Sequence, residues 1–139
     1  MKDKEDKKIK KDKESVYQIG IIGTGRIAAR FLIEARAVKE AEVTIVYNPK
    51  RESAQKFGKK WNVQSTDDLK LFFQMSDIVY VASPHETHYE YILKALQKKK
   101  HVISEKPMVL KRTEAEELCR LAEERNLILL EGIKTLYCP

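Results

Sequence analysis

Several residue types and patterns are scarce in this 139-residue sequence, and each shortage excludes a class of protein. Only two cysteines occur, Cys119 and Cys138, and they fit neither a metal-binding spacing nor a disulfide framework. No apolar run approaches the roughly 20 residues that a membrane helix needs, and the first residues lack the hydrophobic core of a secretion signal. We therefore expect a protein of the reducing cytoplasm with no membrane partner.

A basic stripe interleaved with aromatic residues, the usual mark of a nucleic-acid interface, is also missing. The formal net charge is +6, but residues 1–14 hold seven lysines and five acids and so supply two of those charges. That segment has almost no apolar residues, which predicts a disordered charged tail; the alternative is a weak anion-binding arm. Residues 15–139 have the length of one domain, and we expect no nucleic-acid partner.

The sequence instead contains an alternation of short apolar segments with amphipathic ones. Periodicity predicts helices at 26–40, 50–61 and 67–75, and capping-box spacings at Thr87–Glu90 and Thr113–Glu116 predict the start of two more. The predicted strands are VYQIGIIGTG (16–25, ending in a glycine turn), EVTIVYN (42–48), NVQST (62–66), SDIVYVASP (76–84), HVIS (101–104) and LILLEGIK (127–134).

Strands that alternate with helices in this way indicate an α/β fold. Parallel strands need right-handed helical crossovers, and continuous apolar runs are typical of strands covered on both faces. We therefore expect a doubly wound, mainly parallel Rossmann sheet of about six strands. Ligands of such sheets bind outside the carboxyl ends of the strands.

The segment GIIGTGRIA carries the pattern G-x-G-x-x-A at Gly23, Gly25 and Ala28, between a strand and a helix. In this context the first glycine suits a tight turn, the second lets a pyrophosphate approach the backbone, and the alanine allows close helix–sheet packing. The pattern predicts a dinucleotide site; the alternative is a turn that only joins strand to helix. The cofactor contacts predicted here are Gly23, Thr24, Gly25, Arg26 and Ile27.

The end of the second predicted strand bears on the choice between NAD and NADP. An acid that holds the ribose hydroxyls is expected there for NAD, but the sequence has Asn48, followed by Lys50 and Arg51. An amide beside two cations tolerates a 2′-phosphate, so the sequence leans slightly towards NADP. Alternatively, the two cations are solvated residues that open the next helix.

The segment ASPHETH follows the fourth predicted strand and contains His85 and His88. The H-x-x-H spacing invites a metal site, but catalytic zinc uses three protein ligands and no third is nearby, so we expect no metal. We expect Ser83, Pro84 and the two histidines to line the cofactor groove or cap the helix.

Three motifs together resemble one family. GTGRIA at 23–28, S-P-x-x-x-H at 83–88 and E-K-P at 105–107 resemble the N-terminal domain of the glucose–fructose oxidoreductase / inositol dehydrogenase (Gfo/Idh/MocA) family, over about residues 16–139. The resemblance implies that Lys106 reaches both the nicotinamide and the substrate hydroxyl. It also implies that Glu105 holds the turn or contacts the cofactor and that a cis bond joins Lys106 to Pro107. The family often has asparagine in place of His85.

The function implied is that of an NAD(P)-dependent oxidoreductase, which transfers hydride between nicotinamide and a secondary alcohol of a sugar, cyclitol or related diol. Lys106 would be the catalytic residue, because an ammonium group stabilises developing alkoxide charge. The family's second domain, with the substrate pocket and the general base, is absent from these 139 residues, so we expect cofactor binding with little turnover.

Two other functions remain open from the sequence. One is a stand-alone NADP(H)-binding or sensing module that acts through a protein partner, and the other, weaker, is a methyltransferase. A face left uncovered by the absent domain would also favour self-association into a homo-oligomer.

Overall fold

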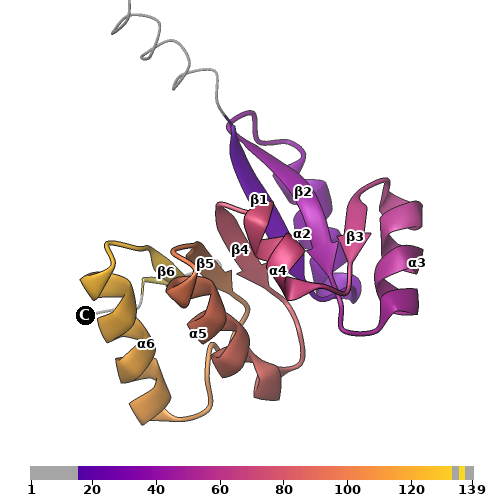
Figure 1. The fold of residues 1–139 in the computed structure, drawn as a ribbon. Coiled ribbons are helices and arrows are strands. Elements are labelled where there is room, and N and C mark those ends of the chain that lie inside the picture. Colours follow the sequence, from indigo (N-terminus) through magenta and orange to yellow (C-terminus); the bar gives the residue numbers. More distant parts are fainter. Residues whose placement is uncertain (1–15, 133–134, 137–139) are drawn as a thin grey trace, which may run out of the picture.

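The structure is a computed structural model that describes residues 16–132 and 135–136 (Figure 1). The predicted tail at 1–14 and Cys138 lie outside the described residues. The elements in chain order are β1 (Tyr17–Ile22), α2 (Arg26–Ala35), β2 (Ala41–Tyr47), α3 (Arg51–Trp61), β3 (Gln64–Thr66), α4 (Leu69–Gln74), β4 (Ile78–Val81), the 3₁₀ turn η1 (His85–Thr87), α5 (His88–Gln97), β5 (His101–Ser104), α6 (Arg112–Glu124), β6 (Leu129–Glu131) and β7 (Thr135–Leu136).

The strands form one sheet in the order β3-β2-β1-β4-β5-β6-β7. The first six of these are paired in parallel, which confirms the predicted doubly wound arrangement. The seventh, β7, pairs antiparallel with β6 and was not predicted as a strand of its own. The strand order reverses between β1 and β4, and this is the point where such sheets bind their ligands.

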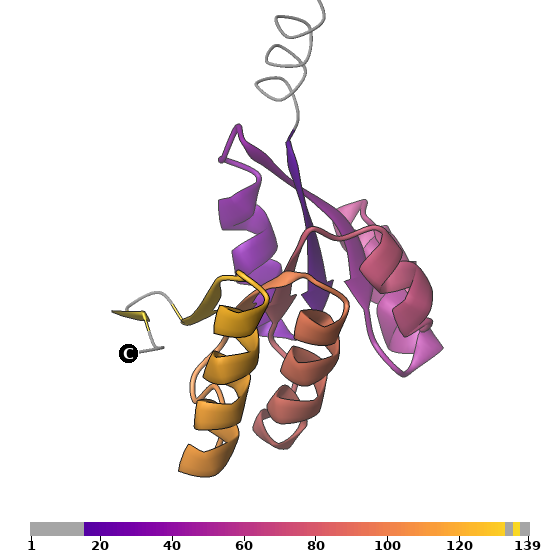
Figure 2. The same cartoon turned by 60° about the vertical axis from the view of Figure 1, so that its left-hand side comes forward.

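Helices cover both faces of the sheet (Figure 2). On one face α4, α5 and α6 bury an apolar cluster that includes Phe72, Ile92 and Leu118, all 0% exposed. On the other face α2 and α3 contribute Leu32 and Phe57 to a second cluster. The central strands are therefore apolar on both sides, as their continuous apolar sequences predict.

Two local predictions were wrong at helix ends. Helix α2 stops at Ala35 instead of extending to residue 40, because a turn closed by the bond from Val38 N to Ala35 O leads the chain into β2. Neither predicted capping box forms. Helix α6 begins at Arg112 with Lys111 as its N-cap, two residues before the predicted cap at Thr113, and the Thr87 hydroxyl donates to Pro84 O (2.6 Å). At Thr87 the 3₁₀ turn η1 places the carbonyl oxygen of Pro84 beside the hydroxyl, which therefore bonds to it instead of capping the N–H groups of α5.

The α2 face of the sheet is not fully covered. A hollow of about 410 Å³ lies between α2 and the strands β4, β5 and β6, with Phe31, Tyr80 and Leu130 among its walls. Self-association through such a face stays a prediction. None of the described helices is long and apolar enough to cross a lipid bilayer.

Candidate functional site

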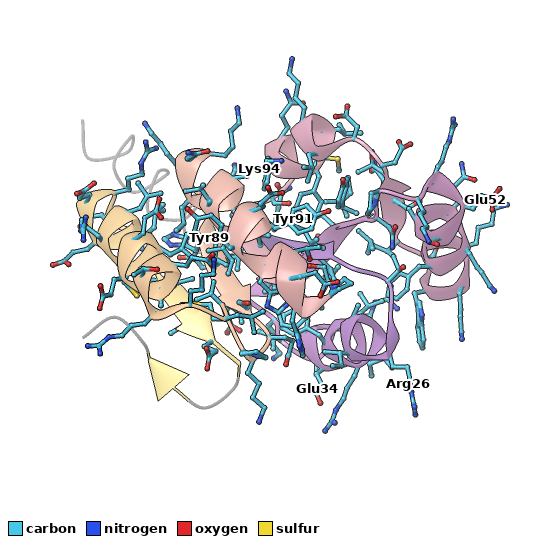
Figure 3. The ribbon with its side chains drawn as sticks, turned by 90° about the horizontal axis from the view of Figure 1, so that it is seen from below. Arg26, Glu34, Glu52, Tyr89, Tyr91 and Lys94 are labelled. Atoms are coloured by element: carbon cyan, nitrogen blue, oxygen red, sulfur yellow. The ribbon has the colours of Figure 1, made fainter. Side chains whose placement is uncertain are left out.

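A pocket of about 770 Å³ opens at the carboxyl edge of the sheet, where the loops after β1, β2 and β4 meet. Figure 3 looks onto the molecule from this side. Predicted site residues from all three loops come together here, although they are as many as 62 positions apart in sequence. Those that line the pocket are Gly23, Thr24, Gly25, Asn48, Lys50, Ser83, Pro84 and His85.

The first glycine of the turn is required by the backbone. Gly23 has φ +115°, which side chains rarely adopt, and a Cβ there would lie 2.7 Å from the carbonyl oxygen of Ala82. Its N–H donates to Tyr47 O (2.9 Å), so the turn is fastened to the end of β2. Gly23 therefore lets three loops approach one another closely.

The second glycine is different, because its backbone does not require it. Gly25 has φ −89° and ψ −167°, an extended conformation open to any residue. A Cβ built there would meet no protein atom within 4 Å and would project into open space, although the residue lines the pocket. Gly25 precedes the first turn of α2, whose N–H groups carry partial positive charge. A smooth backbone at a helix N-terminus fits the pyrophosphate of a dinucleotide.

Asn48 ties two of the loops together. Its amide nitrogen donates to Thr24 Oγ1 (2.9 Å), and its side-chain oxygen accepts from the backbone N–H of Lys50 (2.8 Å). The position that often holds an acid in NAD sites is thus occupied by a neutral, hydrogen-bonded amide. Lys50 lines the pocket, whereas the exposed Arg51 opens α3 and is outside its lining.

The two histidines have separate environments. His85 is exposed and lines the pocket. His88 is 0% exposed, with Nδ1 2.9 Å from Pro107 O and Nε2 2.8 Å from Ser83 O. Both nitrogens of His88 therefore face backbone carbonyls rather than a ligand, and its ring joins the loop after β4 to the loop after β5. Within residues 16–132, no three His, Cys, Asp or Glu side chains gather as a metal site would require.

The loop that carries Lys106 is held on both sides of that residue. Glu105 N donates to Val81 O (2.9 Å), and Met108 N donates to a carboxylate oxygen of Glu131 (2.9 Å). The peptide bond between Lys106 and Pro107 is cis, as the resemblance implied. The Lys106 side chain is exposed at the same carboxyl edge but is not part of the pocket lining.

Glu105 has a structural partner. Its carboxylate accepts a hydrogen bond from the hydroxyl of Tyr80, whose ring stacks on Phe31 with centroids 3.7 Å apart. Burial, followed by this hydrogen bond to Glu105, raises the pKa of Tyr80. Of the two roles implied for Glu105, the geometry supports holding the turn.

Two further predicted residues lie outside the pocket. Ile27 is 54% exposed and borders the hollow on the α2 face. Arg26 lines a separate groove between α2 and α3. Both follow the glycine turn in sequence, but the helix that begins at Arg26 turns their side chains away from the pocket.

Sequence reasoning missed other pocket residues, notably Ser53 and Tyr91. Tyr91 lies on α5, near the centre of the view in Figure 3, one helical turn after His88. It also contributes, after burial, to the rise of the Tyr47 pKa to about 12. The signal available in the sequence was its spacing of three residues from His88, which places both residues on one side of α5.

Comparison with known proteins gives a match over nearly all of the described chain. The family model described as "Oxidoreductase family, NAD-binding Rossmann fold" matches residues 17–133. The scyllo-inositol 2-dehydrogenase (NADP(+)) IolU of Bacillus subtilis (strain 168) is 34% identical over 127 residues, which are 89% of this chain and 39% of that relative. Glucose-6-phosphate 3-dehydrogenase of the same strain is 34% identical over 120 residues, 86% of this chain and 34% of the relative.

A solved structure agrees with these sequence matches. KijD10, a 3-ketoreductase from Actinomadura kijaniata in complex with NADP and TDP-benzene, has a TM-score of 0.79 and 32% identity to this chain. The match covers 85% of this chain and 37% of that one. The chain therefore spans less than half the length of these relatives.

Proposed function

Because this chain belongs to the oxidoreductase family with an NAD-binding Rossmann fold, we propose that it forms the dinucleotide-binding part of a sugar or cyclitol oxidoreductase. The reaction would transfer hydride between nicotinamide and a secondary alcohol of a sugar, cyclitol or related diol. The relatives support this class, since they are named as dehydrogenases of an inositol and of a sugar phosphate.

One observation carries the proposal: the open backbone at Gly25, beside a pocket of about 770 Å³ at the reversal of strand order. A glycine kept where neither φ nor packing demands it leaves room for a ligand. The ligand that suits a helix N-terminus is anionic. The pyrophosphate would lie over Gly25, with the adenosine half towards Asn48 and Lys50 and contacts from Ser83, Pro84 and His85.

We expect NADP(H) to be preferred over NAD(H). Asn48 presents an amide where a carboxylate would repel a 2′-phosphate, and Lys50 and Arg51 follow it directly. The hydrogen bonds of Asn48 to Thr24 and Lys50 hold this loop in place before a ligand binds.

Lys106 would be the catalytic residue contributed by this chain. Bound nicotinamide would supply the hydride acceptor or donor. The Lys106 ammonium would donate a hydrogen bond to the substrate oxygen, stabilising negative charge as the alcohol loses its proton or as the ketone is reduced. The bonds of Glu105 and Met108 to neighbouring strands fix the backbone on either side of this flexible side chain.

The substrate pocket and the general base would come from a further domain, as the lengths of the relatives suggest. A stand-alone sensing module, the main alternative from the sequence, gains no support from relatives that are named as enzymes.

Titration of the chain with NADPH, NADH and S-adenosylmethionine tests the proposal. Saturable NADPH binding, followed by nicotinamide fluorescence, is expected, with weaker NADH binding and no competition by S-adenosylmethionine. A preference for S-adenosylmethionine, or no binding of either dinucleotide, would reject a dinucleotide site.

A further inference from the structure

The residue that precedes Lys106 is bonded to the sheet through its backbone and its side chain. Glu105 N donates to Val81 O (2.9 Å), and Glu105 O accepts from the hydroxyl of Ser104 (3.0 Å). The carboxylate of Glu105 accepts from the hydroxyl of Tyr80. Tyr80 and Val81 are consecutive residues of β4, which lies beside β5 in the sheet (Figure 1). The backbone and the side chain of Glu105 are therefore both attached to the same neighbouring strand.

Tyr80 is a well-fixed donor, because its ring is held on two sides. It is 3% exposed and lies in the sheet between Ile21 of β1 and Ile103 of β5. Its ring stacks on that of Phe31 of α2, with centroids 3.7 Å apart and planes inclined by 7°. Burial, followed by the bond to Glu105, raises the pKa of Tyr80, so the hydroxyl retains the proton that it donates. A donor fixed in this way determines where the carboxylate lies.

The same bond separates the carboxylate of Glu105 from the ammonium group of Lys106. Adjacent residues of opposite charge can pair, but among the described residues the ion pairs within 4.0 Å lie inside α2 and inside α6. Glu105 and Tyr80 both line the hollow on the α2 face, whereas Lys106 does not. Tyr80 therefore holds the carboxylate on the α2 face, and the Lys106 ammonium keeps its donors for a substrate oxygen.

We propose that Tyr80 is a positioning residue for Lys106. Through its hydrogen bond to Glu105 it restrains the backbone before the lysine and keeps the carboxylate away from the ammonium group. This inference rests on the proposed role of Lys106 in hydride transfer and deepens it. Without the Tyr80 hydroxyl, Glu105 keeps its backbone bonds, but its carboxylate is free to turn towards water or towards Lys106.

Four variants separate this bond from the packing around it. Tyr80→Phe removes the hydroxyl and retains the ring that stacks on Phe31. Glu105→Ala removes the acceptor and leaves the buried ring unchanged, whereas Glu105→Gln keeps an oxygen that can accept from the hydroxyl. Tyr47→Phe is the matched control, because it removes the hydroxyl of another buried tyrosine, on β2.

NMR order parameters of the backbone amides measure how firmly the Lys106 loop is held. A rigid backbone gives a value of about 0.85 and a flexible one a value below about 0.6. Lys106 should be near the first value in the original chain, in Tyr47→Phe and in Glu105→Gln. It should approach the second in Tyr80→Phe and in Glu105→Ala. Combining the last two changes should add no further flexibility, because both remove the same bond.

The fluorescence of bound NADPH is a readout that a purely structural role would leave unchanged. Emission per bound molecule is measured at saturation with each form. Because Lys106 is proposed to lie beside the nicotinamide, Lys106→Ala should alter this emission. Tyr80→Phe should alter it in the same direction, with NADPH affinity within about threefold of the original chain in both variants. Tyr47→Phe should leave the emission unchanged.

Three results would overturn the inference. They are a Lys106 loop that stays rigid in Tyr80→Phe and Glu105→Ala, equal flexibility in the Tyr47→Phe control, and emission that changes in Lys106→Ala but not in Tyr80→Phe. Unchanged emission in Lys106→Ala would instead reject the proposed place of Lys106 beside the nicotinamide. If no form binds NADPH, the proposed dinucleotide function is rejected, and the order parameters still decide whether Tyr80 holds the loop.

Discussion

The two glycines of the turn should respond in opposite ways to alanine. At Gly25 a Cβ meets nothing within 4 Å and the backbone is extended, so Gly25→Ala should leave the fold intact. A stiffer unfolded chain stabilises by about 0.4–1 kcal/mol, while loss of a helix-capping glycine costs a similar amount. The free energy of unfolding should therefore change by less than about 1 kcal/mol.

Ligand binding should suffer at the same position. The added methyl would occupy the space through which a pyrophosphate reaches the N–H groups of α2. Hydrogen bonds to charged groups contribute about 1.5–3 kcal/mol each, so losing one or two should weaken NADPH at least about tenfold.

Gly23→Ala should instead destabilise the protein. The positive φ of Gly23 costs a side chain about 1–3 kcal/mol, and a contact of 2.7 Å with a carbonyl oxygen adds steric strain of similar size. The resulting loss of about 2–6 kcal/mol is a large share of the 5–15 kcal/mol typical of a domain.

The assay is urea unfolding followed by NADPH titration, with the original chain and both variants side by side. Stability kept and affinity lost is the expected pattern for Gly25→Ala. If that variant binds NADPH as tightly as the original chain, no phosphate lies over Gly25. If Gly23→Ala unfolds at the original urea midpoint, the close contact with Ala82 does not constrain the turn.

Three other predictions follow from the same geometry. Lys106→Ala should leave NADPH affinity within about threefold, because Lys106 is exposed outside the pocket lining; a tenfold loss by fluorescence titration would contradict a substrate-facing role. Arg51→Ala should weaken NADPH more than NADH, and equal losses would remove Arg51 from the 2′-phosphate site. Because burial raises the pKa of Tyr47 from 10.0 to about 12, the folded protein retains a proton that the unfolded chain loses. The urea midpoint should therefore fall as pH rises from about 10 to 12, and Tyr47→Phe should reduce that fall. If the pH profile of Tyr47→Phe equals that of the original chain, folding does not raise the pKa of Tyr47.

Much of the architecture could be predicted because its signals are local. Apolar runs and helical periodicity located six parallel strands, and G-x-G-x-x-A located the turn. The errors occurred at helix ends, where a turn or the return of the chain to the sheet determines which residue ends or caps the helix. The hydroxyl of Thr87 bonds to Pro84 O rather than capping α5, and α2 stops where the chain must return to the sheet.

The candidate site could be predicted only in part, because its residues bond to partners that are distant in the sequence. The sequence identified Asn48 and His88 as site residues but not their partners, which lie 24 and 19 positions away at Thr24 and Pro107. Burial turned His88 from an expected groove residue into a link between two loops. The position of Lys56 on the groove between α2 and α3 could not be predicted, because in the sequence it does not differ from the other solvated lysines of α3.

The sequence by itself determined the order of strands and helices along the chain, the glycine turn, and the presence of Asn48 rather than an acid at the end of β2. Each of these depends on residues close together in the chain. Only the tertiary structure decided which loops share the pocket, that Gly25 faces open space while Gly23 does not, and that the cations of α2 and α3 border one groove. Those properties arise when segments distant in the sequence pack across the sheet, and their geometry depends on twist and close packing rather than on local preference.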